Sequence, residues 1–408
     1  MREGMASMAT VTTSLEAALE RLEVGIASVG PEGIPGDGEW GVIRLGAVTS
    51  GQFDPVKAKR LPTSVAPRPA LEIRQGDVLM VRVNGARNLV GSVCVVGSTP
   101  PRLMLSDLVM RLVPARHIMD PHFLGIALSA PRVRDQILSR LRGTSGQFQL
   151  PQSEIKSVLL PCPPLVEQRR IVEVIDAVSA QERAIEASIA KLRRVRQGVL
   201  QNFMDRLARS EFSVDWSPVR DVGSVRMGKQ LSPDSRAAGG QFPYLRVANV
   251  LAGCIDYSDV NTMGFTSSER STYQLQPGDI LLNEGQSLEL VGRSAIYRRG
   301  VGEFCFQNTL VRFRAGEGLD PNYAQVVFGY WLRIGVFAGI AKKTTSIAHL
   351  GGDRFGSLQF PLVSPDAQSG LVSAIAACDG DIESGQDEIR KLRALKLGLV
   401  DDLLAGRP

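Results

Sequence analysis

Polar and basic side chains gather at matching places in the two halves of this chain of 408 residues. Arginine, lysine, asparagine, glutamine, serine and threonine are the residue types that bond base edges and phosphates of nucleic acids. In the first half the candidates are Arg44, Lys57, Lys59, Arg60, Arg82, Asn84, Arg87, Asn88, Thr144, Ser145 and Gln147. In the second half they are Arg226, Lys229, Gln230, Arg246, Asn249, Asn283, Gln286, Arg293, Lys342, Lys343, Thr344, Thr345 and Ser346.

For any single member of these two sets, a solvated surface residue is the simpler interpretation. As sets in loops they favour DNA contact, because similar groups recur at equivalent places in both halves. Arg246 and Asn249 have a further alternative, since a polar side chain beside a strand can satisfy neighbouring backbone groups.

Spacings that would support catalysis, a cofactor or a metal are missing from the sequence. The segment Gly223–Gln230 nearly spells a phosphate-binding loop, but Gln230 stands where Ser or Thr must hold Mg²⁺. His117, His122 and His349 show no metal-protease or triad spacing, and the five cysteines form no CxxC pair. There is no Asn-Pro-Pro-Tyr/Phe motif, glycine-rich methyl-donor loop or carboxylate–lysine nuclease cluster. We therefore expect no catalytic residue, no cofactor and no metal.

Composition bounds the partners only broadly. The net charge of +5 and a pI near 9.0 suit a polyanion without establishing one. No apolar run reaches the roughly 18 residues of a membrane span, and the polar start lacks a signal-peptide core. Scattered, odd-numbered cysteines fit reduced thiols. We expect a cytoplasmic protein without a membrane partner.

The elements that must position the polar residues occur twice. The segment 153–207 recurs 200 positions later without a gap. Identical pairs are Ser157 and Ser357, Pro161 and Pro361, Gln168 and Gln368, Ile175 and Ile375, and Ile189 and Ile389. Weaker matches in the same order pair Ile43–Val48 with Leu245–Val250, Gly76–Leu79 with Gly278–Leu281, Leu89–Gly91 with Leu290–Gly292, and Asp120–Pro121 with Asp320–Pro321. This period is too long for a solenoid and predicts internal two-fold pseudosymmetry.

Each half is predicted to hold short strands followed by helices. Apolar and β-branched runs predict strands at Val78–Val83, Ser92–Val96, Leu108–Leu112, Ile280–Leu282, Ala295–Tyr297 and Thr309–Phe313. Asp120 and Asp320 are placed to cap helices that begin at a proline. The helices are predicted at Phe123–Ala130, resuming after Pro131, and at Tyr323–Ala338. A small polar loop follows, 143–149 or 342–349, and then a Pro-containing strand, Val158–Pro164 or Leu358–Pro365.

Two long helices end the halves. In the first, apolar residues from Ile171 to Phe203 alternate in steps of three and four, interrupted by Glu182 and Arg196. The second keeps the same frame, interrupted by Gly385 and Lys396. About five heptads favour a coiled coil, and ~40 residues would form a rod of about 60 Å. Packing of each helix on its own domain is the alternative, but the duplicated frame favours antiparallel pairing. Arg196 and Lys396 could be solvated or contact a partner subunit.

The segment Leu160–Ile171 reads Leu-Pro-Cys-Pro-Pro-Leu-Val-Glu-Gln-Arg-Arg-Ile. It resembles the LPPL-x-EQ-x-x-I signature that opens the helical region of type I restriction–modification specificity subunits. Pro243–Val250, Gly278–Leu281 and Cys305–Asn308 are similar to segments of that family's target-recognition domains. The second copy departs from the signature, since Ala367 replaces its Glu, and the first half lacks the Pro-Tyr opening.

The resemblance implies an α+β protein of four segments. Two α/β target-recognition domains, 1–164 and 209–364, would alternate with helical spacer regions, 165–208 and 365–408. Such a subunit reads double-stranded DNA without catalysis. Each domain reads one half of a bipartite, asymmetric target. The antiparallel helices fix the separation and dock two modification (methyltransferase) subunits, and restriction (translocase–nuclease) subunits join the full complex.

Two other function classes remain open from the residues. A methyltransferase fused to recognition domains is disfavoured by the missing motifs. A methyltransferase-associated scaffold, or a recognition module without DNA specificity of its own, would show no salt-dependent preference for any DNA sequence.

Overall fold

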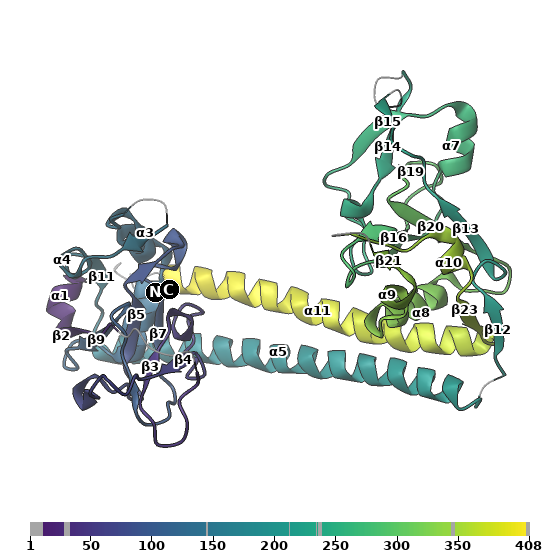
Figure 1. The fold of residues 1–408 in the computed structure, drawn as a ribbon. Helices are drawn as coiled ribbons and strands as arrows, with labels where there is room; N and C mark the ends of the chain where they lie inside the picture. Colours follow the sequence, from purple (N-terminus) through teal and green to yellow (C-terminus); the bar gives the residue numbers. More distant parts are fainter. Residues whose placement is uncertain are drawn as a thin grey trace, which may run out of the picture. The chain divides into compact units, whose positions relative to one another are not determined.

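The computed structural model describes residues 11–27, 33–143, 146–211, 213–233, 235, 239–343 and 347–404. Its contacts divide the chain into two compact units (Figure 1). Unit 1 is Met1–Ala187 with Gln386–Pro408, and unit 2 is Ser188–Gly385. Each unit therefore combines one globular segment with parts of both long helices.

The globular segment of unit 1 is built on an antiparallel sheet of four strands. Its strands, in spatial order, are β2 (Leu19–Val24), β9 (Val109–Pro114), β5 (Val78–Val81) and β7 (Val93–Val95). A second sheet has the order β4 (Ala58–Arg60), β3 (Gly41–Ile43) and β8 (Leu103–Met104). Two-stranded pairs join β1 (Thr12–Ser14) with β11 (Leu159–Pro161), and β6 (Val83–Asn84) with β10 (Phe148–Gln149). The helices are α1 (Leu15–Ala18), α2 (Pro121–Ser129), α3 (Pro131–Ser139) and α4 (Gln152–Lys156), with 3-10 turns η1 (Leu45–Ala47), η2 (Pro69–Leu71) and η3 (Arg87–Leu89).

Unit 2 repeats this plan. Its larger sheet has the order β13 (Gly223–Met227), β20 (Leu310–Ala315), β16 (Ile280–Asn283) and β18 (Ser294–Ile296). The smaller sheet has the order β15 (Asn261–Gly264), β14 (Gln241–Leu245) and β19 (Cys305–Phe306). The remaining strands are β12 (Asp215–Pro218) with β23 (Gln359–Leu362), and β17 (Gly285–Gln286), β22 (Ala348–His349) and β21 (Lys342–Lys343). Helices are α7 (Ser267–Tyr273), α8 (Pro321–Arg333), α9 (Val336–Ile340) and α10 (Gly352–Gly356), with 3-10 turn η4 (Val247–Asn249).

Both larger sheets are buried on two faces. In β5, Val78 and Met80 pack among helices α2 and α3, and Leu79 and Val81 pack against the smaller sheet. Successive side chains of a strand point to opposite faces, which explains the continuous apolar run. Strand β16 repeats the arrangement. The predicted strands are thus confirmed, with ends that shift by one or two residues.

The first turns of α2 and α8 are capped as the sequence predicts. The Asp120 carboxylate accepts hydrogen bonds from the backbone N–H groups of His122 and Phe123, and that of Asp320 accepts one from Asn322. Proline follows each cap, where its missing N–H costs nothing. The long helices in turn bond the backbone of each capping residue.

A buried glutamine in each long helix holds the cap of the shorter one. Gln168 Oε1 accepts the Asp120 N–H at 2.8 Å, and its Nε2 donates to the carbonyls of Ile118 and Pro163 at 2.7 and 2.8 Å. Gln368 makes the same three bonds in unit 2, at 2.8, 3.0 and 2.9 Å. This role explains why the glutamine recurs while the half-exposed Glu167 does not.

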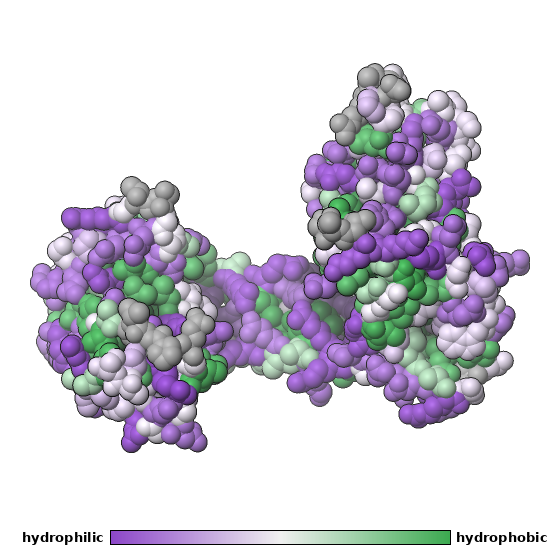
Figure 2. Space-filling model, in the orientation of Figure 1, coloured by the Kyte–Doolittle hydropathy of each residue, from purple (hydrophilic) through white to green (hydrophobic). Residues whose placement is uncertain are grey.

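The helices α5 (Leu165–Ala208) and α11 (Pro365–Leu404) pair antiparallel within each unit. In unit 1, Glu182 accepts from Arg393 at 2.9 Å and Lys396 at 3.1 Å. In unit 2, Arg196 donates to both Asp379 oxygens, at 2.6 and 3.0 Å. Hydrophilic residues cover the visible helix faces, with apolar ones between them (Figure 2).

The seam residues also pack on the globular segments, so helix pairing and domain packing are both present. Ile171 and Ile175 join the core of unit 1, together with Val400 and Leu404 of the other helix. Arg196 and Lys396 each form an ion pair across the helix pair while about a third of each side chain remains exposed, and contact with a partner subunit stays a prediction.

Three predicted elements differ in detail. The helix predicted over Tyr323–Ala338 is broken, because Gly335 has φ +82 and separates α8 from α9. The segment Pro243–Val250, which the family resemblance implies to be a strand, is extended only as far as Leu245 and continues as η4. The predicted loop 342–349 contains β21 and β22, whose short length and polar composition hide them from pattern reading.

Candidate nucleic-acid interface

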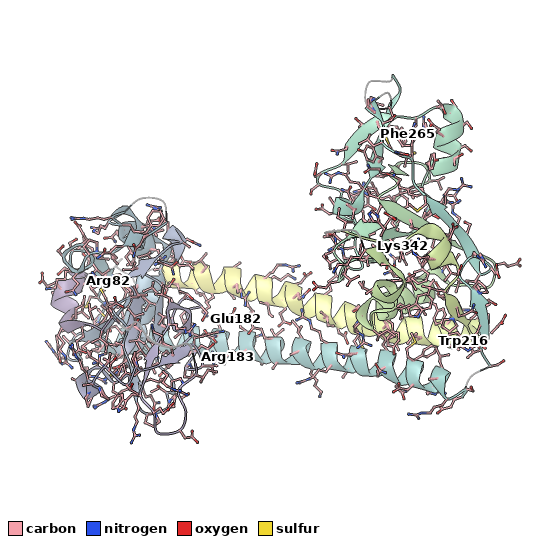
Figure 3. All side chains as sticks on the ribbon, in the orientation of Figure 1. Arg82, Glu182, Arg183, Trp216, Phe265 and Lys342 are labelled. Carbon is pink, nitrogen blue, oxygen red and sulfur yellow. The ribbon has the colours of Figure 1, made fainter. Side chains whose placement is uncertain are left out.

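A small three-stranded sheet in unit 2 presents several of the predicted residues together. We call β17, β22 and β21 the unit 2 platform. Gln286 pairs with Ala348, which pairs with Lys343, and Gly285 pairs with His349, which pairs with Lys342. Residues opposite each other across strands point to the same face. Gln286 and Lys343 therefore share one face. Both lysines are exposed, and Lys342 is labelled in Figure 3.

An acid–imidazole contact lies at the base of this platform. His349 Nδ1 is 3.0 Å from Glu284 Oε2. The His349 carbonyl accepts a hydrogen bond from Arg354 at 2.7 Å, which holds the strand in place. Gln286 Oε1 accepts from the Ser287 N–H at 3.0 Å, so its amide NH₂ stays available for a ligand.

Unit 1 carries the equivalent platform in β6 and β10, extended by a bridge between Arg142 and Gln149. Gly143 beside the bridge has φ +113, and a Cβ there would lie 2.2 Å from the Gln147 carbonyl. Only glycine fits this turn. Arg142 was missed by the sequence reasoning, although it stands 200 positions before Lys342; its guanidinium lies 2.6 Å from Glu154.

The two platforms share a backbone plan but offer different side chains. The Arg82 carbonyl accepts from Leu150 N–H at 2.9 Å, and the Glu284 carbonyl accepts from Leu350 N–H at 2.8 Å, which makes Arg82 and Glu284 equivalent. A cation in unit 1 thus replaces an anion in unit 2. Arg82 is half-buried, with Nη1 3.3 Å from the Asp107 carbonyl. The registers likewise make Asn84 equivalent to Gln286.

Other predicted residues lie elsewhere on the two units. Exposed side chains are Arg44, Lys57, Arg60, Arg87, Asn88, Gln147, Arg226 and Gln230, and half-buried ones are Lys59 and Arg293. Two of the arginines are already engaged, since Arg60 lies 2.8 Å from Glu39 and Arg87 donates to the Leu138 carbonyl at 2.8 Å. No described contact joins all these residues into one site. Thr144, Ser145, Thr344, Thr345 and Ser346 lie outside the described residues.

Four predicted residues are committed to the fold. Lys229 is 2.7 Å from Glu269 and 4.9 Å from the centre of the Phe265 ring. Asn249 is 2% exposed, and its amide donates to the carbonyls of Asp256 and Asp259.

Arg246 and Asn283 complete the set. Arg246 lies 2.5 Å from Asp259 Oδ2, and the completely buried Asn283 is 3.4 Å from the Val250 carbonyl. Asn249 and Asn283 are buried, and Lys229 and Arg246 are already paired with carboxylates of the same unit. We therefore leave Lys229, Asn249, Asn283 and Arg246 out of the candidate interface. The structural alternative describes Asn249, whose amide donates to two backbone carbonyls, whereas the Arg246 side chain pairs with a carboxylate.

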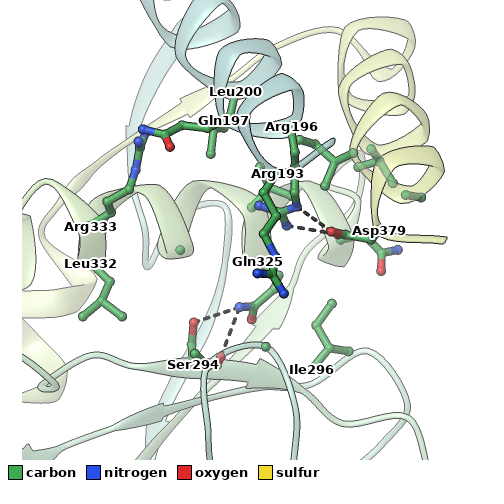
Figure 4. Close-up of a pocket in the computed structure, with 18 of the residues that line it drawn as sticks. Arg193, Arg196, Gln197, Leu200, Ser294, Ile296, Gln325, Leu332, Arg333 and Asp379 are labelled. Atoms are coloured by element: carbon green, nitrogen blue, oxygen red, sulfur yellow. Dashed lines mark hydrogen bonds and ion pairs between the residues drawn. The ribbon is translucent and has the colours of Figure 1, made fainter. Parts of the chain in front are cut away.

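A groove in unit 2 lies between the helix pair and the globular segment (Figure 4). Its volume is about 590 Å³, and the apolar residues that line it include Leu200, Ile296 and Ile375. Leu200 and Ile296 lie on opposite sides of it in the view of Figure 4. Arginines on its wall are Arg193, Arg196, Arg298 and Arg333. The equivalent groove of unit 1, about 660 Å³, mixes Asp176, Glu182 and Glu186 with Arg183, Arg393 and Lys396. The two grooves thus have the same position and different charge.

Groups suited to other chemistry were also sought. Among the described residues, no three His, Cys, Asp or Glu side chains cluster as metal ligands, and no helix is long and apolar enough to cross a membrane. Burial raises the pKa of the Cys94 and Cys305 thiols to about 12, so neither is a ready nucleophile.

Comparisons with known proteins point to one group. No family model matches the chain. It is 29% identical over 147 residues to the type I restriction enzyme EcoEI specificity subunit of Escherichia coli, covering 36% of this chain and 25% of that protein. It is 26% identical over 179 residues to the EcoKI specificity subunit of Escherichia coli strain K12, covering 43% and 38%. The matches thus span well under half the length of these relatives.

Solved structures extend the likeness to the whole chain. The S subunit of a type I restriction–modification system from M. genitalium has a TM-score of 0.57 and 13% identity, with 100% of this chain and 98% of that chain covered. A chain from a structure of type I system assembly has a TM-score of 0.58 and 17% identity, with 97% of each covered. The chain has the fold of type I restriction–modification specificity subunits and resembles them in sequence.

Proposed function

We propose that this chain is the DNA-binding specificity subunit of a type I restriction–modification complex and is itself non-catalytic. The observation that carries the proposal is the pair of equivalent platforms with unlike side chains. A shared backbone plan would present each platform to DNA in the same way. Arg82 against Glu284, and Asn84 against Gln286, would then select different bases. Each globular segment would read one half of a bipartite, asymmetric target.

The long helices would set the separation of the two half-sites. Each helix passes from one unit into the other, and a helix advances ~1.5 Å per residue. One heptad added to both helices would change the separation by ~10 Å, about three base pairs. In this proposal the recognition segments are 1–164 and 209–364, and the helical segments are 165–208 and 365–408.

We further propose that the helix pair docks two modification subunits, with restriction subunits joining the full complex. Support comes from the groove beside the helices in each unit, which combines apolar lining residues with charged ones and offers area for a partner. A DNA partner would place the protein in the cytoplasm.

The experiment combines the full chain with its modification subunits and maps methylated positions on a DNA library by sequencing. A split, asymmetric motif is expected. Methylation without any motif would support the scaffold alternative, and methyl transfer by the purified chain alone would show that it is an enzyme. If the complex bound all DNA sequences with equal affinity at every salt concentration, the proposed sequence specificity would be contradicted.

A further inference from the structure

A buried arginine in unit 2 lacks the counter-charge that its equivalent in unit 1 possesses. Arg312, in the middle of β20, is 5% exposed, and its Nε is buried without a hydrogen-bond partner. Its neighbour on the inner side is the Phe306 ring, 5.6 Å from the guanidinium carbon. Among the described residues, no carboxylate lies within ion-pair distance of Arg312. A buried cation in this situation is costly unless something pairs with it.

Arg111 is the equivalent residue in unit 1, because it pairs with Leu79 as Arg312 pairs with Leu281. Its guanidinium is saturated. Nε donates to Glu23 at 2.6 Å and Nη1 to Asp77 at 3.0 Å. The same group also donates to two backbone carbonyls, at 2.8 and 2.7 Å.

The difference lies on the neighbouring edge strand. Glu23 stands opposite Arg111 in unit 1, whereas Arg226 stands opposite Arg312 in unit 2. Like charges directly opposite each other destabilise a sheet. The nearby Asp279 does not compensate, because both its oxygens bind Arg314, at 2.6 and 2.8 Å.

The charges of the two clusters can be compared directly. In unit 2, the charges that act on Arg312 are the two cations Arg226 and Arg314 and one carboxylate, Asp279, which Arg314 binds. In unit 1, Arg21 and Arg111 face the three carboxylates of Glu20, Glu23 and Asp77. Burial lowers the pKa of Arg312 to about 10, partly offset by Asp279 and reinforced by Arg314 and Arg226. Even so, Arg312 remains charged at neutral pH, and the unit 2 cluster keeps an excess of positive charge.

We propose that unit 2 binds a phosphate-class anion between Arg226 and Arg312, where unit 1 places the Glu23 carboxylate. Arginine matches such an anion through two parallel N–H donors. Access is from the sheet edge, since β13 is the outer strand and Arg226 is exposed. The anion is either free phosphate or a phosphate of the DNA backbone. Free phosphate could occupy this site whether or not the chain recognises DNA.

The test measures thermal unfolding of the full chain in sodium phosphate and in sodium chloride of equal ionic strength. Phosphate also stabilises proteins by exclusion from their surface. Variants must therefore separate the increase in melting temperature that comes from site binding from this general increase. Arg226→Glu recreates the unit 1 arrangement. Arg220→Glu makes the same charge change at an exposed site outside the cluster.

Arg226→Glu is expected to raise the melting temperature without phosphate and to lose most of the phosphate increment. Arg220→Glu should keep the wild-type increment, and Arg226→Gln should show a reduced one. An increment that is equal in wild type and Arg226→Glu would overturn the proposal. A lower melting temperature of Arg226→Glu in chloride, with the increment kept, would overturn it as well.

A second arm identifies the source of the anion by measuring affinity for a 30-base-pair duplex. A DNA phosphate is the ligand if Arg226→Glu weakens binding at least several-fold more than Arg220→Glu. Free phosphate is the ligand if the two variants bind the duplex alike while only Arg226→Glu loses the increment. If neither variant alters the melt or the duplex affinity, the site does not exist.

Discussion

The glutamine that holds each helix cap offers a quantitative test of the fold. Gln168 is fully buried and satisfies one backbone N–H and two carbonyls. Gln168→Ala would leave these three groups without a partner. At about 1 kcal/mol for each unsatisfied buried group, the expected loss is about 3 kcal/mol. For a unit of this size, each kcal/mol lowers the melting temperature by about 2 to 4 °C.

The assay is calorimetric unfolding of the full chain, which can show separate transitions for the two units. Glu167→Ala is the matched control in the same motif, since Glu167 is half-exposed and its contact with Arg170 is 3.9 Å. A change within about 0.5 kcal/mol is expected there. Gln368→Ala should destabilise unit 2 as Gln168→Ala destabilises unit 1. If Gln168→Ala and Glu167→Ala lowered the free energy of unfolding equally, Gln168 would not be what holds the helix cap.

Three further predictions concern the helix pair and the thiols. Burial raises the pKa of Glu182, but hydrogen bonds from Arg393 and Lys396 on α11 outweigh this and hold the pKa below its ordinary value of 4.5. The ionised Glu182 should therefore stabilise the fold above pH 4.5, and this stabilisation should be lost as the pH falls below that value. Urea unfolding of Glu182→Gln should lose less stability in acid than wild type does, and an identical pH profile would contradict this. A thiol reagent should modify the exposed Cys254 in the folded chain and reach the buried Cys94 and Cys305 only after unfolding; mass spectrometry that finds early labelling of Cys94 would count against the packed sheet. Inserting one heptad in both α5 and α11 should lengthen the gap of the methylated motif by about three base pairs, and an unchanged gap would exclude the helices as spacers.

The duplicated architecture could be predicted from the sequence, because the hydrophobic periodicity and the internal repeat indicate the same elements in both halves. The apolar runs of β5 and β16 marked buried strands, and the heptad frame marked the helix pair. Caps at Asp120 and Asp320 followed from short-range chemistry. These features depend on residues close together in the chain.

Other features depend on contacts between distant segments and could not be predicted. The platform strands are two residues long, too short for a period to show. The buried Asn249 and Asn283 bond backbone carbonyls of Asp256, Asp259 and Val250, contacts that residue spacing alone does not reveal. The partners of Arg196 and Lys396 lie on the opposite helix, so their spacing along one helix could not reveal the ion pairs. Arg142 became visible only through its bridge to Gln149.

Methylation mapping tests the central claim most directly when it is repeated with one variant in each platform. The full chain carrying Asn84→Ala, or the equivalent Gln286→Ala, is combined with the modification subunits, and the methylated motif is read by sequencing. Each variant is expected to relax one half of the split motif and leave the other half and the gap unchanged. Loss of both halves by either variant, or an unchanged motif in both, would contradict the assignment of one platform to each half-site.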